Sequence, residues 1–171
     1  MKFPIRIVIM SLSALFLATG CASVISKSVL DKVDRNVTFQ SLKANPDQFT
    51  GRVVVFGGQI LATTAKQSET WVEVLQKPLD SSDKPEDTDV SYGRFLILFQ
   101  GFADPAIYHS GRKITVAGEV QGKKVLPLNQ IEYTYPVIIP REHHILRPED
   151  GPRYRGSLPI GISIGIGGVF H

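Results

Sequence analysis

The sequence has one cysteine, one tryptophan and almost no net charge beyond its N-terminal segment. A single cysteine, Cys21, excludes an internal disulfide and needs another role in an exported chain. The 19 Lys and Arg residues stand against 16 Asp and Glu, and two of the 19, Lys2 and Arg6, lie in a segment that we expect to be removed. A nearly neutral mature chain gives no indication of nucleic-acid binding. The sequence also lacks a Gly-x-Ser-x-Gly elbow, a Walker loop and a Cys–His nucleophile pair, so we expect neither catalysis nor a cofactor.

The first 21 residues have the pattern of a secretory signal that ends in a lipid-modified cysteine. Lys2 and Arg6 form a positive region, and the apolar stretch 7–17 is too short to span a bilayer. Small residues then lead to Cys21, and the arrangement resembles the bacterial lipobox, although Ala18 stands where Leu is preferred. The resemblance implies cleavage between Gly20 and Cys21 and attachment of diacylglycerol and a further acyl chain such as palmitate to Cys21. An ordinary signal peptide that leaves a stray thiol is the alternative.

The residue after Cys21 indicates the membrane. In the sorting rule for such lipoproteins, Asp at this position retains the protein at the inner membrane, and this chain has Ala22. We therefore expect a lipid-anchored outer-membrane protein whose domain lies in the periplasm. Each buried CH₂ contributes about 0.8 kcal/mol, so several acyl chains make a stable anchor where one is marginal.

The remaining chain divides into a tether, a domain and a tail. We expect residues 21–36 to be a lipidated tether or loose amphipathic turn, residues 37–140 the domain, and residues 141–171 a C-terminal tail. Thr38 is a candidate cap for a short helix that carries Phe39 and Leu42. Asn45-Pro46 then ends that helix.

Strand patterns follow the helix. Apolar or alternating stretches predict strands at 52–62, 69–76, 93–99, 112–121 and 125–139. We expect a bulge or bend at Gly57-Gly58, a turn at 122–124, and an end to the last strand at Pro136 and Pro140. About five strands with mostly local pairing favour a small OB-like antiparallel β-barrel with one short helix; an open sandwich normally has more strands.

Several sequence blocks are similar to those of one known family. They are 45–46 with 49–53, 57–60, 73–76 with 78–80, 89–95, 101–102 with 104–105, 108 with 111–112, 115–118 and 133–136. On these blocks the chain resembles the Slp family of outer-membrane lipoproteins, which are named for induction on starvation. The resemblance covers the lipobox and roughly residues 37–140. It implies a lipoprotein of the stressed or stationary cell with no established enzyme activity.

Two groups of residues have the composition of metal sites without the spacing. The loop 79–90 carries five acidic residues, but an EF-hand that begins at Asp80 would place Lys84 at its fifth position, and no Gly follows. A solvated acidic loop is the better interpretation. His143 and His144, beside Glu142, would point to opposite faces of a strand, and an exposed tail fits them better than a metal site.

Trp71 is the candidate ligand-binding residue. Glu69, Trp71 and Glu73 share one face of the expected strand 69–76. Four residues of strand span about 13 Å, too far for the two carboxylates to act as a glycosidase pair. Trp71 therefore either packs under a loop or offers a stacking surface for a sugar or another envelope polymer.

The C-terminal segment Ser157–His171 alternates isoleucine with glycine and serine. As a strand it would present four isoleucines on one face and almost nothing on the other. It is either a Gly-rich disordered tail or a strip that packs on the domain or a partner, including a second copy of the chain. Two functions follow from the whole sequence: a structural or interaction lipoprotein linked to starvation or envelope stress, or a periplasmic ligand-binding module that uses the Trp71 face.

Overall fold

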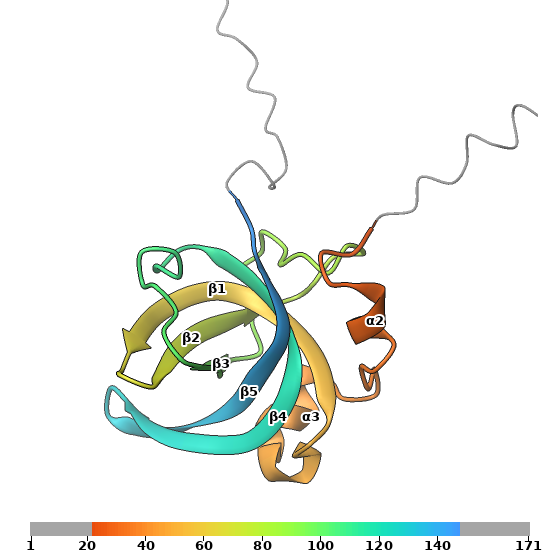
Figure 1. Cartoon of the computed structure of the whole chain (residues 1–171). Helices are drawn as coiled ribbons and strands as arrows, with labels where there is room; N and C mark the ends of the chain where they lie inside the picture. The colour runs from red at the N-terminus through yellow and green to blue at the C-terminus, as the bar shows by residue number, and fades with distance from the viewer. Residues whose placement is uncertain (1–21, 148–171) are drawn as a thin grey trace, which may run out of the picture.

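The computed structural model describes residues 22–147, and within them five strands close into a barrel (Figure 1). The strand order around the barrel is β1-β2-β3-β5-β4, with β4 hydrogen-bonded back to β1. The strands are β1 (Val53–Ala65), β2 (Glu69–Lys77), β3 (Arg94–Gln100), β4 (Lys113–Leu128) and β5 (Ile131–Ile145).

The expected fold class, a small OB-like barrel of about five strands, is confirmed, with two differences in detail. The β3–β5 pair is parallel while the other pairs are antiparallel, so the sheet is mixed. Two short α-helices precede the barrel, α2 (Lys27–Leu30) and α3 (Phe39–Ala44), and the 3₁₀ turn η2 (Pro46–Phe49) follows them. The parallel pair joins strands distant in sequence, which local turn patterns cannot indicate.

Helix α3 contributes its apolar side chains to the barrel core. Thr38 Oγ1 accepts a hydrogen bond from the Ser41 backbone N–H at 3.1 Å, which confirms the predicted cap. Phe39 and Leu42 are both buried, and the Phe39 ring meets Phe56 and Phe95 edge-on at 5.3 and 5.9 Å. Burial of such side chains contributes about 1.5–3 kcal/mol each, which holds the short helix on the barrel.

Strand β2 alternates as its sequence predicts. Its inward residues Thr70, Val72, Val74 and Gln76 are at most 5% exposed, while the residues between them are half-buried on the outer face. The face that carries Trp71 is thus the outside of the barrel.

The glycines of β1 have another role than the expected bulge. Gly57 and Gly58 pair in register with both β2 and β4, and the register shift lies at Ile60–Ala62. A Cβ on Gly58 would lie 1.9 Å from the Leu75 carbonyl oxygen. The glycines therefore allow the backbones of neighbouring strands to approach closely where β1 pairs with β2 and β4 at the same residues.

The expected turn at 122–124 is wrong, because β4 continues through it to Leu128. The β4–β5 register shifts between Val120 and Gly122, and Gly122 has φ +107°. A glycine in the left-handed region is typical of a β-bulge as well as of a turn, so the local pattern is ambiguous. The chain reverses instead at Asn129-Gln130, where Asn129 has φ +54°.

Pro136 and Pro140 do not end the last strand, which runs on to Ile145. Pro140 lies where the register against β4 shifts between Ala117 and Gly118, and Pro136 follows directly on the Val120–Gly122 shift. Bulges are places where a strand accommodates a residue without an N–H donor.

The stretch expected to be a tether lies against the barrel over Ser23–Ser26. The Val24 N–H donates to the Ser82 carbonyl at 3.0 Å, and Ile25 is 2% exposed. Cys21, the signal segment 1–20 and the isoleucine–glycine segment 157–171 lie outside the described residues. Between residues 22 and 147, no helix is both long and apolar enough to cross a membrane.

Candidate ligand-binding hollow

Trp71 is fixed on the outer face of β2 by its neighbour Glu69. The indole Nε1–H donates to Glu69 Oε1 at 2.7 Å, and Lys66 Nζ lies 3.0 Å from the same oxygen. The hydrogen bond from Trp71, followed by that from Lys66, lowers the pKa of the Glu69 carboxyl, which stays ionised. The ring is thus oriented before any ligand arrives.

A second lysine lies over the indole ring. Lys124, from β4, has its Nζ 3.6 Å from the ring centre, while Lys66 Nζ is 6.0 Å from it. A cation over an indole face is attracted by about 0.5–2 kcal/mol, depending on how far it is desolvated. Within residues 22–147 no carboxylate lies in ion-pair contact with Lys124, although its charge helps to lower the pKa of the Glu69 carboxyl.

These side chains border a hollow of about 190 Å³ on the outside of the barrel. Strand β4 forms one wall, and β1, the β1–β2 turn, β2 and β3 form the rest. Its lining residues are Ala62, Thr64, Lys66, Trp71, Glu73, Leu96, Lys124 and Leu126. Pockets for whole small molecules measure about 300–1,000 Å³, so this one accommodates a single ring or a short side chain.

Glu73, at the edge of the hollow, is held by two partners distant in sequence. Glu73 Oε1 accepts hydrogen bonds from Arg94 Nη1 at 2.8 Å and from Tyr135 Oη at 3.0 Å. The hydrogen bond to Glu73 raises the pKa of Arg94, and burial followed by that same carboxylate raises the pKa of Tyr135. Glu73 is therefore a structural anchor, and its contacts give no indication of a general acid or base.

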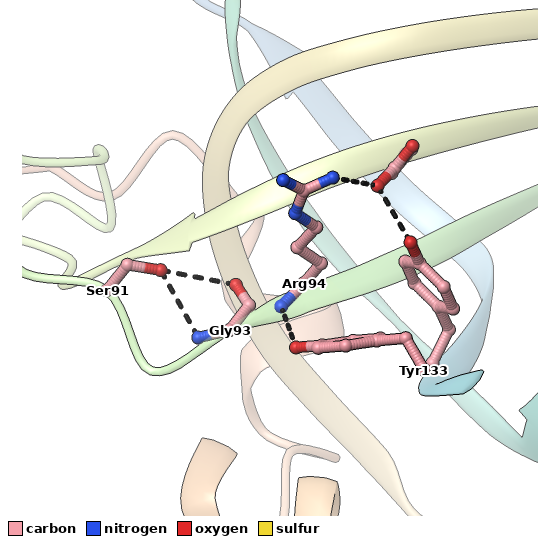
Figure 2. Close-up of polar contacts among 6 residues, drawn as sticks. Ser91, Gly93, Arg94 and Tyr133 are labelled. Carbon is pink, nitrogen blue, oxygen red and sulfur yellow. Dashed lines mark hydrogen bonds and ion pairs between the residues drawn. The ribbon is translucent and has the colours of Figure 1, made fainter. Parts of the chain in front are cut away.

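Figure 2 shows how the same network ties the end of the β2–β3 loop to β5. The Arg94 backbone N–H donates to Tyr133 Oη at 2.9 Å, and the Ser91 hydroxyl contacts both the N–H and the carbonyl of Gly93. The Tyr133 and Tyr135 rings lie 4.7 Å apart. The end of the β2–β3 loop is thus fixed to β5 and, through Glu73, to one lining residue of the hollow.

The sequence identified Trp71, Glu69 and Glu73 but missed their partners. The structure keeps all three on one face, as expected, and adds Lys66, Lys124 and Arg94. Arg94 and the two tyrosines occur in the sequence blocks that resemble the family, but no local pattern pairs them with Glu73. Tyr135 and Glu73 are 62 residues apart in the sequence, and only the closing of the barrel brings them together.

The acidic loop 79–90 uses its first aspartate for a turn. Asp80 Oδ1 accepts hydrogen bonds from the Ser82 and Lys84 backbone N–H groups, so it caps a turn. Among residues 22–147, no group of three or more His, Cys, Asp or Glu side chains is placed to hold a metal ion.

His143 and His144 lie in β5 rather than in a tail. His143 Nε2 is 2.7 Å from Tyr108 Oη, and its ring meets Phe99 edge-on at 5.0 Å. Burial against these rings, and then the nearby His144, lowers the pKa of His143. This histidine is a packing residue at the β3–β5 side of the barrel.

The sequence was compared with known families and proteins. It matches the model of the outer membrane lipoprotein Slp family over residues 18–160. Outer membrane protein Slp of Escherichia coli (strain K12) is 30% identical over 127 residues, which cover 72% of this chain and 66% of that protein. An uncharacterized protein of Haemophilus influenzae is 40% identical over 88 residues, 51% of this chain and 48% of that protein. The uncharacterized lipoprotein YeaY of Escherichia coli (strain K12) is 34% identical over 77 residues, 45% of this chain and 39% of that protein.

The chain thus aligns with 39% to 66% of the length of these relatives. Neither the family description nor the relatives' names indicate a catalytic activity. The family match covers most of the chain and confirms the resemblance seen in the sequence blocks. This protein belongs to the Slp family of outer membrane lipoproteins.

Proposed function

We propose that this lipoprotein is anchored by acyl chains on Cys21 and holds a polymer of the cell envelope in the hollow around Trp71, without catalysis. The anchor is supported by the lipobox-like sequence and by the family match, which begins at residue 18 and so includes Cys21. Ala22 supports delivery to the outer membrane. The mature domain then lies in the periplasm.

The observation that carries the binding proposal is the arrangement of Trp71 between Glu69 and Lys124. Trp71 is half-buried and packs in part against the apolar cluster of Leu96, Leu98, Tyr135 and Val137. Here its N–H is bonded at 2.7 Å and a lysine lies over its face. A preoriented ring lowers the entropic cost of binding, which is typical of recognition sites.

The size and charge of the hollow define the ligand class. A volume of about 190 Å³ holds one ring or short side chain at a time, which suits one unit of a longer polymer. Glu69 and Glu73 are in ion-pair contact with Lys66 and Arg94. Lys124 lies over the Trp71 ring and is in ion-pair contact with no carboxylate among residues 22–147. The ligand therefore carries an acidic group next to its ring, as an acidic glycan does.

Trp71 is the only tryptophan of the chain, so fluorescence excited selectively at tryptophan, and not at the five tyrosines, reports on this hollow. Titration with soluble acidic glycan fragments of the cell wall is expected to change the emission, and Lys124→Gln is expected to weaken binding about tenfold, equivalent to ~1.4 kcal/mol. Lys32→Gln is the matched control, because Lys32 is exposed and does not line the hollow. Equal affinities for the two variants would contradict the proposal.

A structural or interaction role under starvation or envelope stress is the second candidate. It is favoured by Phe102 and Ile107, which expose 71% and 51% of their surface on the loop between β3 and β4. Exposed apolar side chains on one loop are typical of protein-binding surfaces. If this role is correct, cells that express the double variant Phe102→Ser, Ile107→Ser should lose envelope integrity under acid, starvation or detergent stress. Cells that express Trp71→Leu should keep it.

A further inference from the structure

The chain that leads from Cys21 is attached to the barrel almost at once. The Ser23 hydroxyl donates to Asp83 Oδ2, and the Val24 N–H donates to the Ser82 carbonyl. Ile25 is buried, and the Ser26 N–H donates to Glu142 Oε1 at 2.9 Å. Three of these four consecutive residues are therefore hydrogen-bonded to the β2–β3 loop or to β5, and the fourth is buried.

The part of the loop that receives this segment is itself rigid. Asp80 caps the turn 80–84, and Leu79 pairs with Pro85 across it. The Asp83 carbonyl accepts a hydrogen bond of 2.6 Å from Thr115 Oγ1, and Thr115 is fully buried in β4. Asp83 thus joins the N-terminal segment on one side to the barrel on the other. We call residues 79–85 the clamp turn.

Only Ala22 separates Cys21 from Ser23. Two residues of extended chain span at most about 7 Å. The headgroup layer on each side of a bilayer is about 5–8 Å thick, since total thickness is 40–45 Å around a core of about 30 Å. The acyl chains of Cys21 would lie in the hydrocarbon core, which places Cys21 at the boundary between the core and the headgroup layer. The two residues from Cys21 to Ser23 are then only just long enough to cross the headgroup layer.

We propose that the clamp turn rests on the lipid headgroups and fixes the barrel in one orientation on the membrane. The inference rests on the acylation of Cys21 in the proposed function. The surface needs no apolar insertion, because the acyl chains supply the affinity. Ser81 is exposed at the tip of the clamp turn, while the carboxylates of Asp80 and Asp83 are turned to partners in the protein.

This orientation places the Trp71 hollow away from the membrane. The clamp turn follows the C-terminal end of β2, and Trp71 lies near its beginning, six residues or about 20 Å along the strand. In Figure 1 the N-terminal segment leaves on one side of the barrel, and the β1–β2 and β4–β5 hairpin tips lie on the other. The hollow is then presented to the periplasm.

The experiment uses the full acylated protein in vesicles of phosphatidylethanolamine and phosphatidylglycerol. Because Cys21 is the only native cysteine and is blocked by acylation, Ser81→Cys supplies one free thiol for a fluorescent label. Lipids with a nitroxide on the headgroup are expected to quench this label severalfold more than a label on Gln130→Cys, which is exposed at the β4–β5 turn.

A lengthened variant separates orientation from anchoring. Ten Gly and Ser residues inserted between Ala22 and Ser23 add about 17 Å of flexible reach, so quenching at position 81 is expected to fall to the level at position 130. Equal quenching of the two labels without the insert would overturn the orientation. The mass of the N-terminal peptide tests the anchor separately: an unmodified Cys21 would overturn the acylation itself.

Discussion

Gly93 occupies a position that strongly disfavours any residue with a side chain. Its φ is +136°, and a Cβ there would lie 2.5 Å from Tyr133 Oη and 2.7 Å from Lys43 Nζ. Lys43 Nζ in turn donates to the Tyr92 carbonyl and lies 5.1 Å from the Tyr133 ring centre. One glycine thus lets helix α3, the β2–β3 loop and β5 meet.

Gly93→Ala is expected to lower the free energy of unfolding by about 2–4 kcal/mol. Backbone strain accounts for about 1–3 kcal/mol of this. The rest comes from displacing Tyr133 Oη, which would lose its hydrogen bond from the Arg94 N–H. Gly101→Ala is the matched control. Gly101 has φ +111°, but its Cβ would meet nothing within 4 Å, so it reports the backbone strain alone. Urea unfolding of both variants measures the difference. Equal losses would show that the meeting of α3, loop and β5 at Gly93 is loose.

Glu73 is expected to contribute far more to stability than an exposed carboxylate. Glu73→Ala leaves Arg94 Nη1 and the nearly buried Tyr135 Oη without their acceptor, at a cost of about 1–3 kcal/mol. Glu119→Ala breaks a surface pair with Arg141 whose side chains are 45% and 42% exposed, and should cost less than about 1 kcal/mol. The same unfolding assay ranks the two variants, and a reversed order would contradict the assigned role of Glu73.

At the scale of the element, sequence periodicity predicts faces better than ends. Strand β2 has strict alternation, and the buried set follows from it directly. The ends of β4 and β5 were predicted too early, because Gly122 and Pro136 are common both in turns and at bulges. Only the long-range pairing of β4 with β5 decides between the two.

Only those residues of the candidate site that lie on strand β2 could be predicted from the sequence. Glu69, Trp71 and Glu73 share a face through the two-residue period of β2. Lys124 contacts the indole because the fold brings the end of β4 next to β2. Arg94 contacts Glu73 because β3 pairs with β2. These are consequences of closure, which no local pattern contains.

Strand β5 also carries a pH-dependent contact. Burial lowers the pKa of His143 below its ordinary 6.5, so the unfolded chain binds this proton more readily than the folded one. The contribution of neutral His143 to the free energy of unfolding is therefore fully present above about pH 6.5, and it is lost as the pH falls below that value. In His143→Gln the unfolding free energy should decline less between pH 7.5 and 5.5. The slopes are compared by urea unfolding at each pH, and an unchanged slope would contradict this origin of the pH dependence.

For the whole molecule, the two ends of β2 lie at the two surfaces for which we propose separate roles. One end carries the clamp turn, to which the N-terminal segment is bonded, and the other carries Trp71 and the hollow. In the proposed orientation, the barrel between them would keep the hollow at a fixed height above the membrane as long as the N-terminal segment remains bound to the clamp turn. The stability of that docking therefore decides whether the orientation persists.

Ile25 is the residue that tests whether the N-terminal segment belongs to the folded unit. It is 2% exposed although it lies only four residues after Cys21. Ile25→Ala should lower the free energy of unfolding by about 2 kcal/mol, at the low end for buried isoleucine because the site lies at the edge of the barrel. Val125→Ala, at a side chain 47% exposed, should cost about 0.5 kcal/mol or less. Urea unfolding monitored by the single Trp71 gives both values. If the two variants unfold at the same urea concentration, the segment is not part of the cooperative unit, and the barrel is free to turn on its anchor.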